Sequence, residues 1–431
     1  MIKNPENIGT TITIINNKKH NLCLYRGIKN MNPIEIDNEK CVITDTNLTK
    51  TQFYNRIDEI NLLSSLLNST EFNSSPTILL TGIRGVGKTA IIKKIKKKFD
   101  NEYLVVDIDL SRSNIYQQKN LTRGSIIKII YDSIIKASKE FGLRTVDKQI
   151  EKYFKTNKFK IDKLISYEHI PIPIFESEEN YAKLADFVME LPQKIYEDNS
   201  DKLKGVFIFI DEIQLIKDLD NVNKFLWYMR SFIQDQKNVA YLFCGSMSLK
   251  DSLINDLNGK EGAFGGRMLT IEIHPFSKQT TINYLKSLSR NLQLEDKAFE
   301  RFYKCTRGIP YYINIFAKIL PENITLTENN IIELFKDSID FLAVHFIFMW
   351  SKLTFQEQKI IISLLDDPKR RIEIANTLEV TSGSLNRPLN RLLNFDLIEY
   401  TNDKYQITDL IFVQWLKNTY EKNGTYPFRS I

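Results

Sequence analysis

Five short runs of almost continuous apolar residues mark the first part of the chain. They are PTILLTG at 76–82, YLVVDIDL at 103–110, GVFIFID at 205–211, VAYLFCG at 239–245 and LTIEIHPF at 269–276. Stretches with apolar positions at helical spacing separate them. Continuous apolar strands bounded by turns are typical of a parallel sheet that helices cover on both faces. The pattern therefore predicts an α/β core from about residue 49 to residue 276.

The segments on either side of the first strands carry weaker signals. Between the second and third runs, residues 124–141 and 180–196 have helical spacing, whereas HIPIPIF at 169–175 contains two prolines that force extended backbone. We expect an irregular connection there. Residues 1–48 contain short alternating stretches such as TITII and CVIT, which are a weak β signal without a motif.

The pattern changes again after the fifth run. Helical spacing dominates from 277 to about 345, and we expect no further strands there. Beyond this, the sequence predicts helices at 353–365, 370–380 and 382–400 and a hairpin in YTNDKYQITD at 400–409. Three helices followed by a hairpin are typical of a winged helix. The predicted domains are an N-terminal segment of unknown role (1–48), the core (49–276), a helical lid (277–345) and a winged-helix domain (346–431).

The first apolar run leads directly into a glycine-rich loop. The sequence GIRGVGKT satisfies GxxxxGK[ST], and the helix-patterned stretch AIIKKIKKKF follows it. Glycines let backbone N–H groups converge on phosphate oxygens at a helix N-terminus, where the dipole also favours anions. Lys88 is expected to reach the β- and γ-phosphates, and Thr89 to bind Mg²⁺. The predicted nucleotide-binding residues are Gly82, Ile83, Arg84, Gly85, Val86, Gly87, Lys88, Thr89 and Ala90.

A pair of carboxylates ends the third apolar run. Because a carboxylate at the C-terminal end of a strand can hold the Mg²⁺ shell beside the phosphate loop, Asp211 is the predicted metal-side residue. Glu212 follows it and is expected to polarise the attacking water as general base. No NKxD motif follows a strand, so adenine is favoured over guanine.

These parts and their spacing, with an extra strand between the two motifs, resemble the AAA+ and STAND branch of P-loop ATPases. In detail the chain is similar to the archaeal-type ATPase family, over about residues 50–420. FYNRIDE at 53–59 resembles the FxxRxxE segment beside the adenine, which implies that Phe53 and Arg56 bind there, although Asn55 stands where Gly is common. The resemblance implies an ATPase that uses ATP and Mg²⁺ on a P-loop NTPase fold.

Three further positions carry the resemblance. Ser246, after Gly245, matches the sensor-1 position that contacts the γ-phosphate or its water. Arg267 matches a GR element whose arginine, in related AAA+ initiators, reaches the ATP of a neighbouring subunit. Pro310 matches the GxP lid motif of STAND ATPases, in which the proline packs near the base of the nucleotide and replaces the usual sensor-2 arginine. This replacement predicts slow hydrolysis. A strand-end turn, a surface ion pair and a plain helix boundary are the respective alternatives.

Composition limits the kinds of partner, metal site and cellular location that we expect, but it does not decide the function. A formal charge of +6 from 59 basic and 53 acidic residues permits nucleic-acid contact without arguing for it. The four cysteines and four histidines are far apart and lack CxxC spacing, which argues against a zinc site or a disulfide framework. The start lacks a signal-peptide core, and the longest apolar run, 341–350, is too short to span a bilayer. We expect a cytoplasmic protein with no membrane contact.

Two functions fit these motifs. The first is a nucleotide-controlled switch, in which ATP and ADP set the position of lid and winged helix and thereby assembly into a homo-oligomer or binding of a protein partner. The second is a DNA-binding ATPase of initiator or remodelling type. We favour the first, because the third predicted helix offers essentially Arg387 and Arg391 for duplex DNA. A nucleotide-binding protein without catalysis is a third reading, against which Lys88, Asp211 and Glu212 argue.

Overall fold

The chain divides into two compact units, Met1–Asn47 and Leu48–Ile431. The computed structural model describes residues 53–112, 121–143, 164–167, 170–173, 178–247, 252–288, 291–395 and 397–427, all of them in the second unit. The weak β signal predicted at 1–48 lies outside the described residues.

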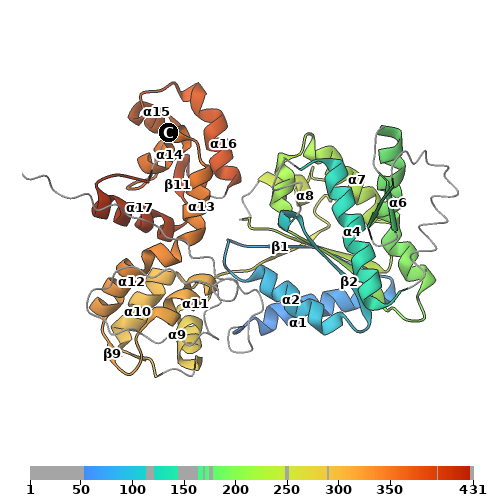
Figure 1. Cartoon of the computed structure of the whole chain (residues 1–431), viewed down its shortest axis with the longest axis horizontal. Helices are drawn as coiled ribbons and strands as arrows, with labels where there is room; N and C mark the ends of the chain where they lie inside the picture. Colours follow the sequence, from blue (N-terminus) through green and yellow to red (C-terminus); the bar gives the residue numbers. More distant parts are fainter. Residues whose placement is uncertain are drawn as a thin grey trace, which may run out of the picture. The chain divides into compact units, whose positions relative to one another are not determined.

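A five-stranded parallel sheet forms the centre of the core, and all five predicted runs contribute a strand (Figure 1). The strands are β1 (Thr77–Thr81), β2 (Tyr103–Asp109), β5 (Gly205–Asp211), β6 (Val239–Cys244) and β7 (Leu269–Glu272), in the spatial order β2-β5-β6-β1-β7. Every side chain of β5 and β6 is buried, which explains their uninterrupted apolar sequence. Because all strands run parallel, their carboxyl ends meet at one edge. There Gly82 and Gly245 follow β1 and β6, and Asp211 is the last residue of β5.

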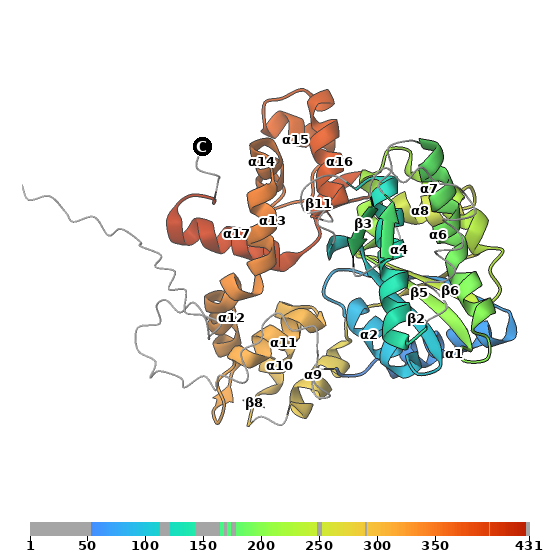
Figure 2. The ribbon, with the colours of Figure 1, turned by 45° about the vertical axis from the view of Figure 1, so that its right-hand side comes forward.

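Helices cover the two faces of this sheet, as the apolar runs predicted. The first face carries α1 (Ile57–Asn68) and α2 (Lys88–Phe99), whose apolar side chains share a buried cluster with alternate residues of the strands. The second carries α4 (Arg123–Phe141), α6 (Glu178–Asp198), α7 (Val222–Ile233) and α8 (Ser252–Asn258). Figure 2 shows α4 and α6 side by side over this second face. The core is therefore the three-layer fold of a P-loop NTPase.

The long connection before β5 contains more regular structure than we expected. Residues Leu164–Tyr167 (β3) and Ile170–Pro173 (β4) pair as an antiparallel hairpin, so the extended backbone predicted from the prolines is present, but as a strand. Short 3₁₀ turns lie at Ser69–Phe72 (η1), Leu110–Arg112 (η2) and Ile213–Asp218 (η3). The last of these follows the carboxylate pair directly.

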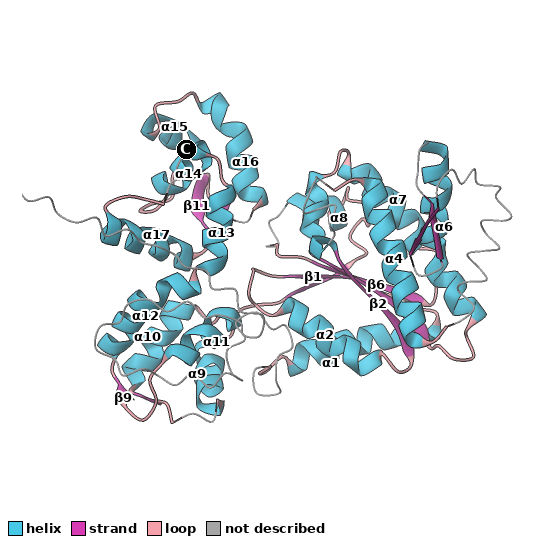
Figure 3. Cartoon of the chain, in the orientation of Figure 1, coloured by secondary structure: helices cyan, strands magenta, loops and turns pink. Residues whose placement is uncertain are grey.

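Residues 277–345, called the lid segment below, are mostly helical (Figure 3). They contain α9 (Lys278–Ser287), α10 (Asp296–Thr306), α11 (Pro310–Ile319) and α12 (Glu328–Leu342). The expectation of no strands was wrong, because Gln293–Leu294 (β8) and Thr325–Leu326 (β9) pair in parallel. Two-residue strands are too short to produce an alternating pattern in the sequence.

Residues 346–431, the C-terminal segment, begin within α13 (Val344–Lys352). The described elements that follow are α14 (Phe355–Ser363), α15 (Arg371–Thr377), η4 (Ser382–Leu385), α16 (Asn386–Asn394), β10 (Ile398–Thr401), β11 (Lys404–Ile407) and α17 (Leu410–Asn423). The third predicted helix was too long, since its last residues form β10, and α17 was not predicted. The winged-helix assignment remains a prediction.

Buried side chains of the lid and C-terminal segments form one continuous cluster, from Phe276 through Phe316 and Trp350 to Leu416. The two segments therefore share a core, and the predicted boundary at 345 does not separate two sets of buried residues. Among the described helices, none combines the length and apolar character needed to cross a bilayer.

Candidate nucleotide site

The phosphate loop takes a backbone path that its glycines make possible. Gly82, Gly85 and Gly87 have φ angles of 140°, 84° and 98°, in the region that side chains disfavour. A Cβ on Gly82 would lie 2.4 Å from the Ile273 carbonyl oxygen, so only glycine fits there. Since α2 begins at Lys88 directly after Gly87, the first amides of the helix point into this loop. The arrangement can cradle a phosphate.

The ammonium group of Lys88 lies inside the loop, and the residue is only 6% exposed. Its Nζ donates to the carbonyl oxygens of Gly82 (2.7 Å) and Ile83 (3.1 Å) and to Ser246 Oγ (3.2 Å). These three partners are neutral groups, so the ammonium can turn to a phosphate without breaking an ion pair with any of them. The contact also brings Ser246, at the end of β6, to the phosphate loop, as its sensor-1 prediction requires.

Thr89 and Asp211 meet across the two motifs. Thr89 Oγ1 donates to Asp211 Oδ2 at 2.8 Å, and Asp211 Oδ1 accepts from the backbone N–H of Glu212 at 2.9 Å. A hydroxyl and a carboxylate are hard oxygen donors of the kind that Mg²⁺ prefers, usually with waters and substrate phosphates completing its shell. These two residues fit the predicted magnesium site.

Glu212 has a backbone conformation that few residues with side chains adopt, with φ 58°. Its carboxylate accepts a hydrogen bond from Gln214 Nε2. Burial raises the pKa of Glu212, and the Asp211 charge raises it further, while Gln214, Arg84 and Lys88 act in the opposite direction. A partly buried carboxylate beside the phosphate loop can serve as a general base.

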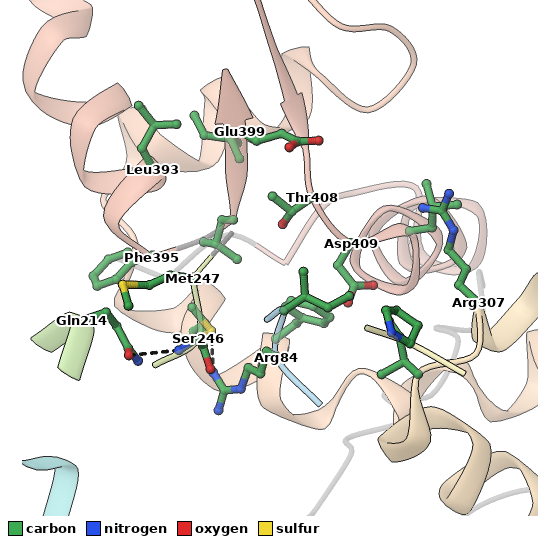
Figure 4. Close-up of a pocket in the computed structure, with 18 of the residues that line it drawn as sticks. Arg84, Gln214, Ser246, Met247, Arg307, Leu393, Phe395, Glu399, Thr408 and Asp409 are labelled. Carbon is green, nitrogen blue, oxygen red and sulfur yellow. Dashed lines mark hydrogen bonds between the residues drawn. The ribbon is translucent and has the colours of Figure 1, made fainter. Parts of the chain in front are cut away.

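Gln214 is the site residue that the sequence analysis missed. It lies in η3, where its Oε1 accepts from the Ser246 backbone N–H at 3.1 Å, a contact drawn in Figure 4. Its side chain thus bonds both to Glu212 and to the end of β6. In the sequence, the one signal for Gln214 as a site residue is its position two residues after the carboxylate pair.

A cavity of about 1510 Å³ opens beside these groups (Figure 4). Arg84, Glu212 and Ser246 line it from the core, and Arg307 from the lid segment. The C-terminal segment contributes further walls, among them Leu393, Phe395, Glu399, Thr408 and Asp409. The surface of the core that carries Arg84, Glu212 and Ser246 therefore faces both later segments of the chain.

The predicted GxP element contacts the phosphate loop directly. The Tyr311 backbone N–H donates to the Gly85 carbonyl at 3.2 Å, one residue after Pro310, which begins α11. Gly308 has φ 72°, and its carbonyl accepts from the Phe276 N–H at 2.7 Å. A Cβ there would lie 2.0 Å from the Phe276 oxygen, so the close approach requires glycine. This contact fixes the start of α11 against the loop that holds phosphate.

Arg56 makes hydrogen bonds to the phosphate loop and to the residues that follow β7. The residue is 7% exposed, and its Nη2 donates to the carbonyl oxygens of Val86 (3.0 Å) and His274 (2.8 Å). The guanidinium also lies 4.7 Å from the centre of the Phe276 ring. Phe53 is partly buried, with Lys94 Nζ 5.7 Å from its ring centre. Contact of Phe53 and Arg56 with adenine remains a prediction.

Arg267 lies apart from these groups. It is exposed, it follows two glycines with positive φ, and it does not line the cavity. Within the described part of the chain its guanidinium makes no hydrogen bond or ion pair. An arginine so placed is available to a second molecule, and its predicted action on a neighbouring subunit is untested.

The chain is similar to known ATP-binding proteins. The profile of a family described as an ATPase domain predominantly from Archaea matches residues 53–316. An uncharacterized ATP-binding protein of Methanocaldococcus jannaschii is 28% identical over 248 residues, or 56% of this chain, which spans 64% of the length of that curated relative. The Walker-type ATPase of Pyrococcus abyssi superposes with a TM-score of 0.56 at 16% identity, over 85% of this chain and 97% of that one. This last likeness shows a shared fold.

Proposed function

Because the chain belongs to the family of ATPase domains found predominantly in Archaea, we propose that it binds and slowly hydrolyses ATP and acts as a nucleotide-controlled switch. In this proposal the bound nucleotide sets the position of the lid and C-terminal segments, and through them assembly or partner binding.

The residues predicted from the two motifs and from the sensor-1 and GR positions each have a task in the proposed reaction. Lys88 and the amides of the phosphate loop bind the β- and γ-phosphates, and Ser246 contacts the γ-phosphate or its water. Glu212 takes the proton of the attacking water. Mg²⁺, held by Thr89 and Asp211, would neutralise charge on the phosphate oxygens. Arg267, we further propose, acts on the nucleotide of a neighbouring copy.

The observation that carries the switch proposal is that α11 connects the phosphate loop to the C-terminal segment. Tyr311 bonds to Gly85 of the loop, and the next residue, Tyr312, donates its hydroxyl hydrogen to Asp409 Oδ2 at 2.6 Å. Asp409 caps α17, because its Oδ1 accepts from the Ile411 N–H at 2.7 Å. Burial raises the pKa of Tyr312, with Asp409 adding to the rise, so the hydroxyl keeps its proton and remains the donor. A movement of the phosphate loop can thus be transmitted to α17 through two consecutive residues of α11.

Tyr312→Phe tests this connection. The variant deletes the hydrogen bond to Asp409 while keeping the ring in the shared core, so ATP should still bind within about threefold of wild-type affinity. In wild type, amide hydrogen exchange in α17 should differ between the ADP state and the state with a non-hydrolysable ATP analogue. We expect the variant to lose at least half of that difference.

Tyr228→Phe is the matched control, since it removes a hydroxyl bonded to Asp186 at 2.9 Å on the second face of the core. It should retain the full nucleotide response of α17. A Tyr312→Phe protein with the wild-type difference in hydrogen exchange would rule out this connection. If exchange in α17 of the wild type is the same with both nucleotides, the switch itself is ruled out.

Contacts within the C-terminal segment argue against the DNA-binding alternative. Arg391 Nη1 lies 3.3 Å from Glu357 Oε1, and Glu357 is only 2% exposed. Arg391 also lies over the Phe395 ring, with 5.3 Å to its centre. Of the two cations that the third predicted C-terminal helix offers to DNA, one is therefore bound within the segment, which leaves exposed Arg387. A DNA reader normally uses several phosphate contacts.

We expect the full chain to show no micromolar or tighter binding to duplex DNA at physiological salt. Fluorescence anisotropy over a salt series, with wild type and Arg387→Ala, measures this. Arg387 is chosen because loss of Arg391 would leave Glu357 buried without its ion-pair partner. Micromolar binding that weakens steeply with salt, and weakens further in Arg387→Ala, would make the DNA-binding function the better one.

A further inference from the structure

A continuous chain of hydrogen bonds connects the phosphate-binding lysine to the proposed base. Lys88 Nζ donates to Ser246 Oγ at 3.2 Å, and the Ser246 backbone N–H donates to Gln214 Oε1 at 3.1 Å. Gln214 Nε2 then donates to Glu212 Oε2. Gln214 is the middle member of the chain and the one to which the proposed reaction gives no task.

The orientation of the Gln214 amide follows from its two partners. The N–H of Ser246 can only donate, so it requires the oxygen of the amide, and Glu212 in the ionised form that the proposed base needs can only accept, so it requires the nitrogen. Turning the amide by 180° would lose both hydrogen bonds. The side chain therefore fits this place in one way only.

The end of β6 is shaped around this amide. A Cβ on Gly245 would lie 2.9 Å from Gln214 Oε1 and 2.8 Å from Met247 Cε, so a larger residue there would require these side chains to shift. Figure 4 shows Gln214 directed at Ser246 on the wall of the cavity. The Gly245-Ser246 pair thus has two uses, since the serine supplies a hydroxyl and the glycine makes room for Gln214.

We propose that Gln214 is a positioning residue that holds the Glu212 carboxylate in place and fixes its distance from Ser246. The inference rests on the proposed function, because it assumes that Glu212 is the base. When ATP draws Lys88 to its phosphates, the Ser246 hydroxyl becomes available to the γ-phosphate. Gln214 then keeps the base aligned with the residue that contacts this phosphate, and without it the carboxylate can rotate away from the water.

Two substitutions separate the two hydrogen bonds of Gln214. Gln214→Ala deletes both of them. Gln214→Glu keeps an oxygen for the Ser246 N–H but replaces the donor to Glu212 by a second carboxylate. We expect both variants to lower kcat by about 10- to 100-fold, because a small misplacement of a reacting group has an effect of that size. ATP affinity by calorimetry should stay within about threefold of wild type.

Combination with Glu212→Gln shows whether Gln214 acts through the base. In that background Gln214→Ala should lower kcat by less than about twofold further, because residues that act through one another are not additive. Gln236→Ala is the matched control. Gln236 is a buried glutamine that also makes two hydrogen bonds, to Met189 and Tyr241, so its loss should lower thermal stability and leave kcat unchanged.

Three results overturn the inference about Gln214 alone: wild-type kcat in Gln214→Ala, wild-type kcat in Gln214→Glu, or a full multiplicative loss in the double variant. The second would assign Gln214 to the Ser246 backbone only. If Glu212→Gln itself keeps wild-type turnover, or if the wild-type protein does not hydrolyse ATP, the proposed base is wrong and the inference fails with it. The Glu212→Gln measurement therefore distinguishes the two failures.

Discussion

Lys88→Ala is expected to abolish measurable ATP binding while the protein stays folded. Lys88 is the buried cation whose Nζ already lies among the loop oxygens that surround the phosphate site. A hydrogen bond to a charged group contributes about 1.5–3 kcal/mol, so loss of contacts to two phosphates weakens binding by two or more orders of magnitude. Alanine also removes a positive charge that acts on Glu212, which adds to the repulsion between this carboxylate and the triphosphate.

Calorimetric titration with ATP and Mg²⁺ measures this loss directly. Lys97→Ala is the control, because it removes a lysine from the exposed side of the same helix and should bind ATP like wild type. Thermal melting gives a second readout, since ATP should raise the Tm of wild type and Lys97→Ala but not that of Lys88→Ala. ATP affinity in Lys88→Ala equal to that of wild type would show that the nucleotide binds elsewhere.

The sheet and the phosphate loop could be predicted because their physical demands fix the residue types. A strand buried on both faces must be apolar throughout, as β5 and β6 are. A loop that turns its amides toward a phosphate requires positive φ, and Gly82, Gly85 and Gly87 supply it. Each demand concerns a few neighbouring residues, so it is visible in a short window of sequence.

The residues that the sequence did not reveal depend on contacts between distant segments. Gln214 acquires its place only when η3 lies beside the end of β6, 32 positions further along the chain. Tyr312 and Asp409 are 97 positions apart and meet because the lid and C-terminal segments share a core. The sequence around a glutamine, a tyrosine or an aspartate contains no periodic pattern that would identify such a distant partner. The length of the third C-terminal helix failed for a related reason, since Ile398 pairs with Ile407 of β11.

Glu212→Gln should leave ATP binding nearly intact and slow hydrolysis by a factor on the order of 10² or more. The substitution removes the negative charge that accepts the proton of the attacking water, while Asp211 and Thr89 keep their contact. Glutamine and glutamate have almost the same shape, so the substitution adds no bulk to a residue whose backbone has a φ of 58°. The amide oxygen can still accept from Gln214 Nε2.

Phosphate release under saturating ATP, with the dissociation constant measured separately, tests this. Glu272→Gln, at the C-terminal end of β7 in the same sheet, is the control and should turn over like wild type.

If Arg267 acts on a neighbouring copy, mixing inactive Glu212→Gln with Arg267→Ala should restore part of the activity, because mixed assemblies contain sites with an intact base and a partner's intact arginine. Loss of activity on Arg267→Ala in a strictly monomeric protein would assign that arginine a role within its own chain. Unchanged turnover in Glu212→Gln would remove Glu212 from the reaction and leave the water to be activated by another group.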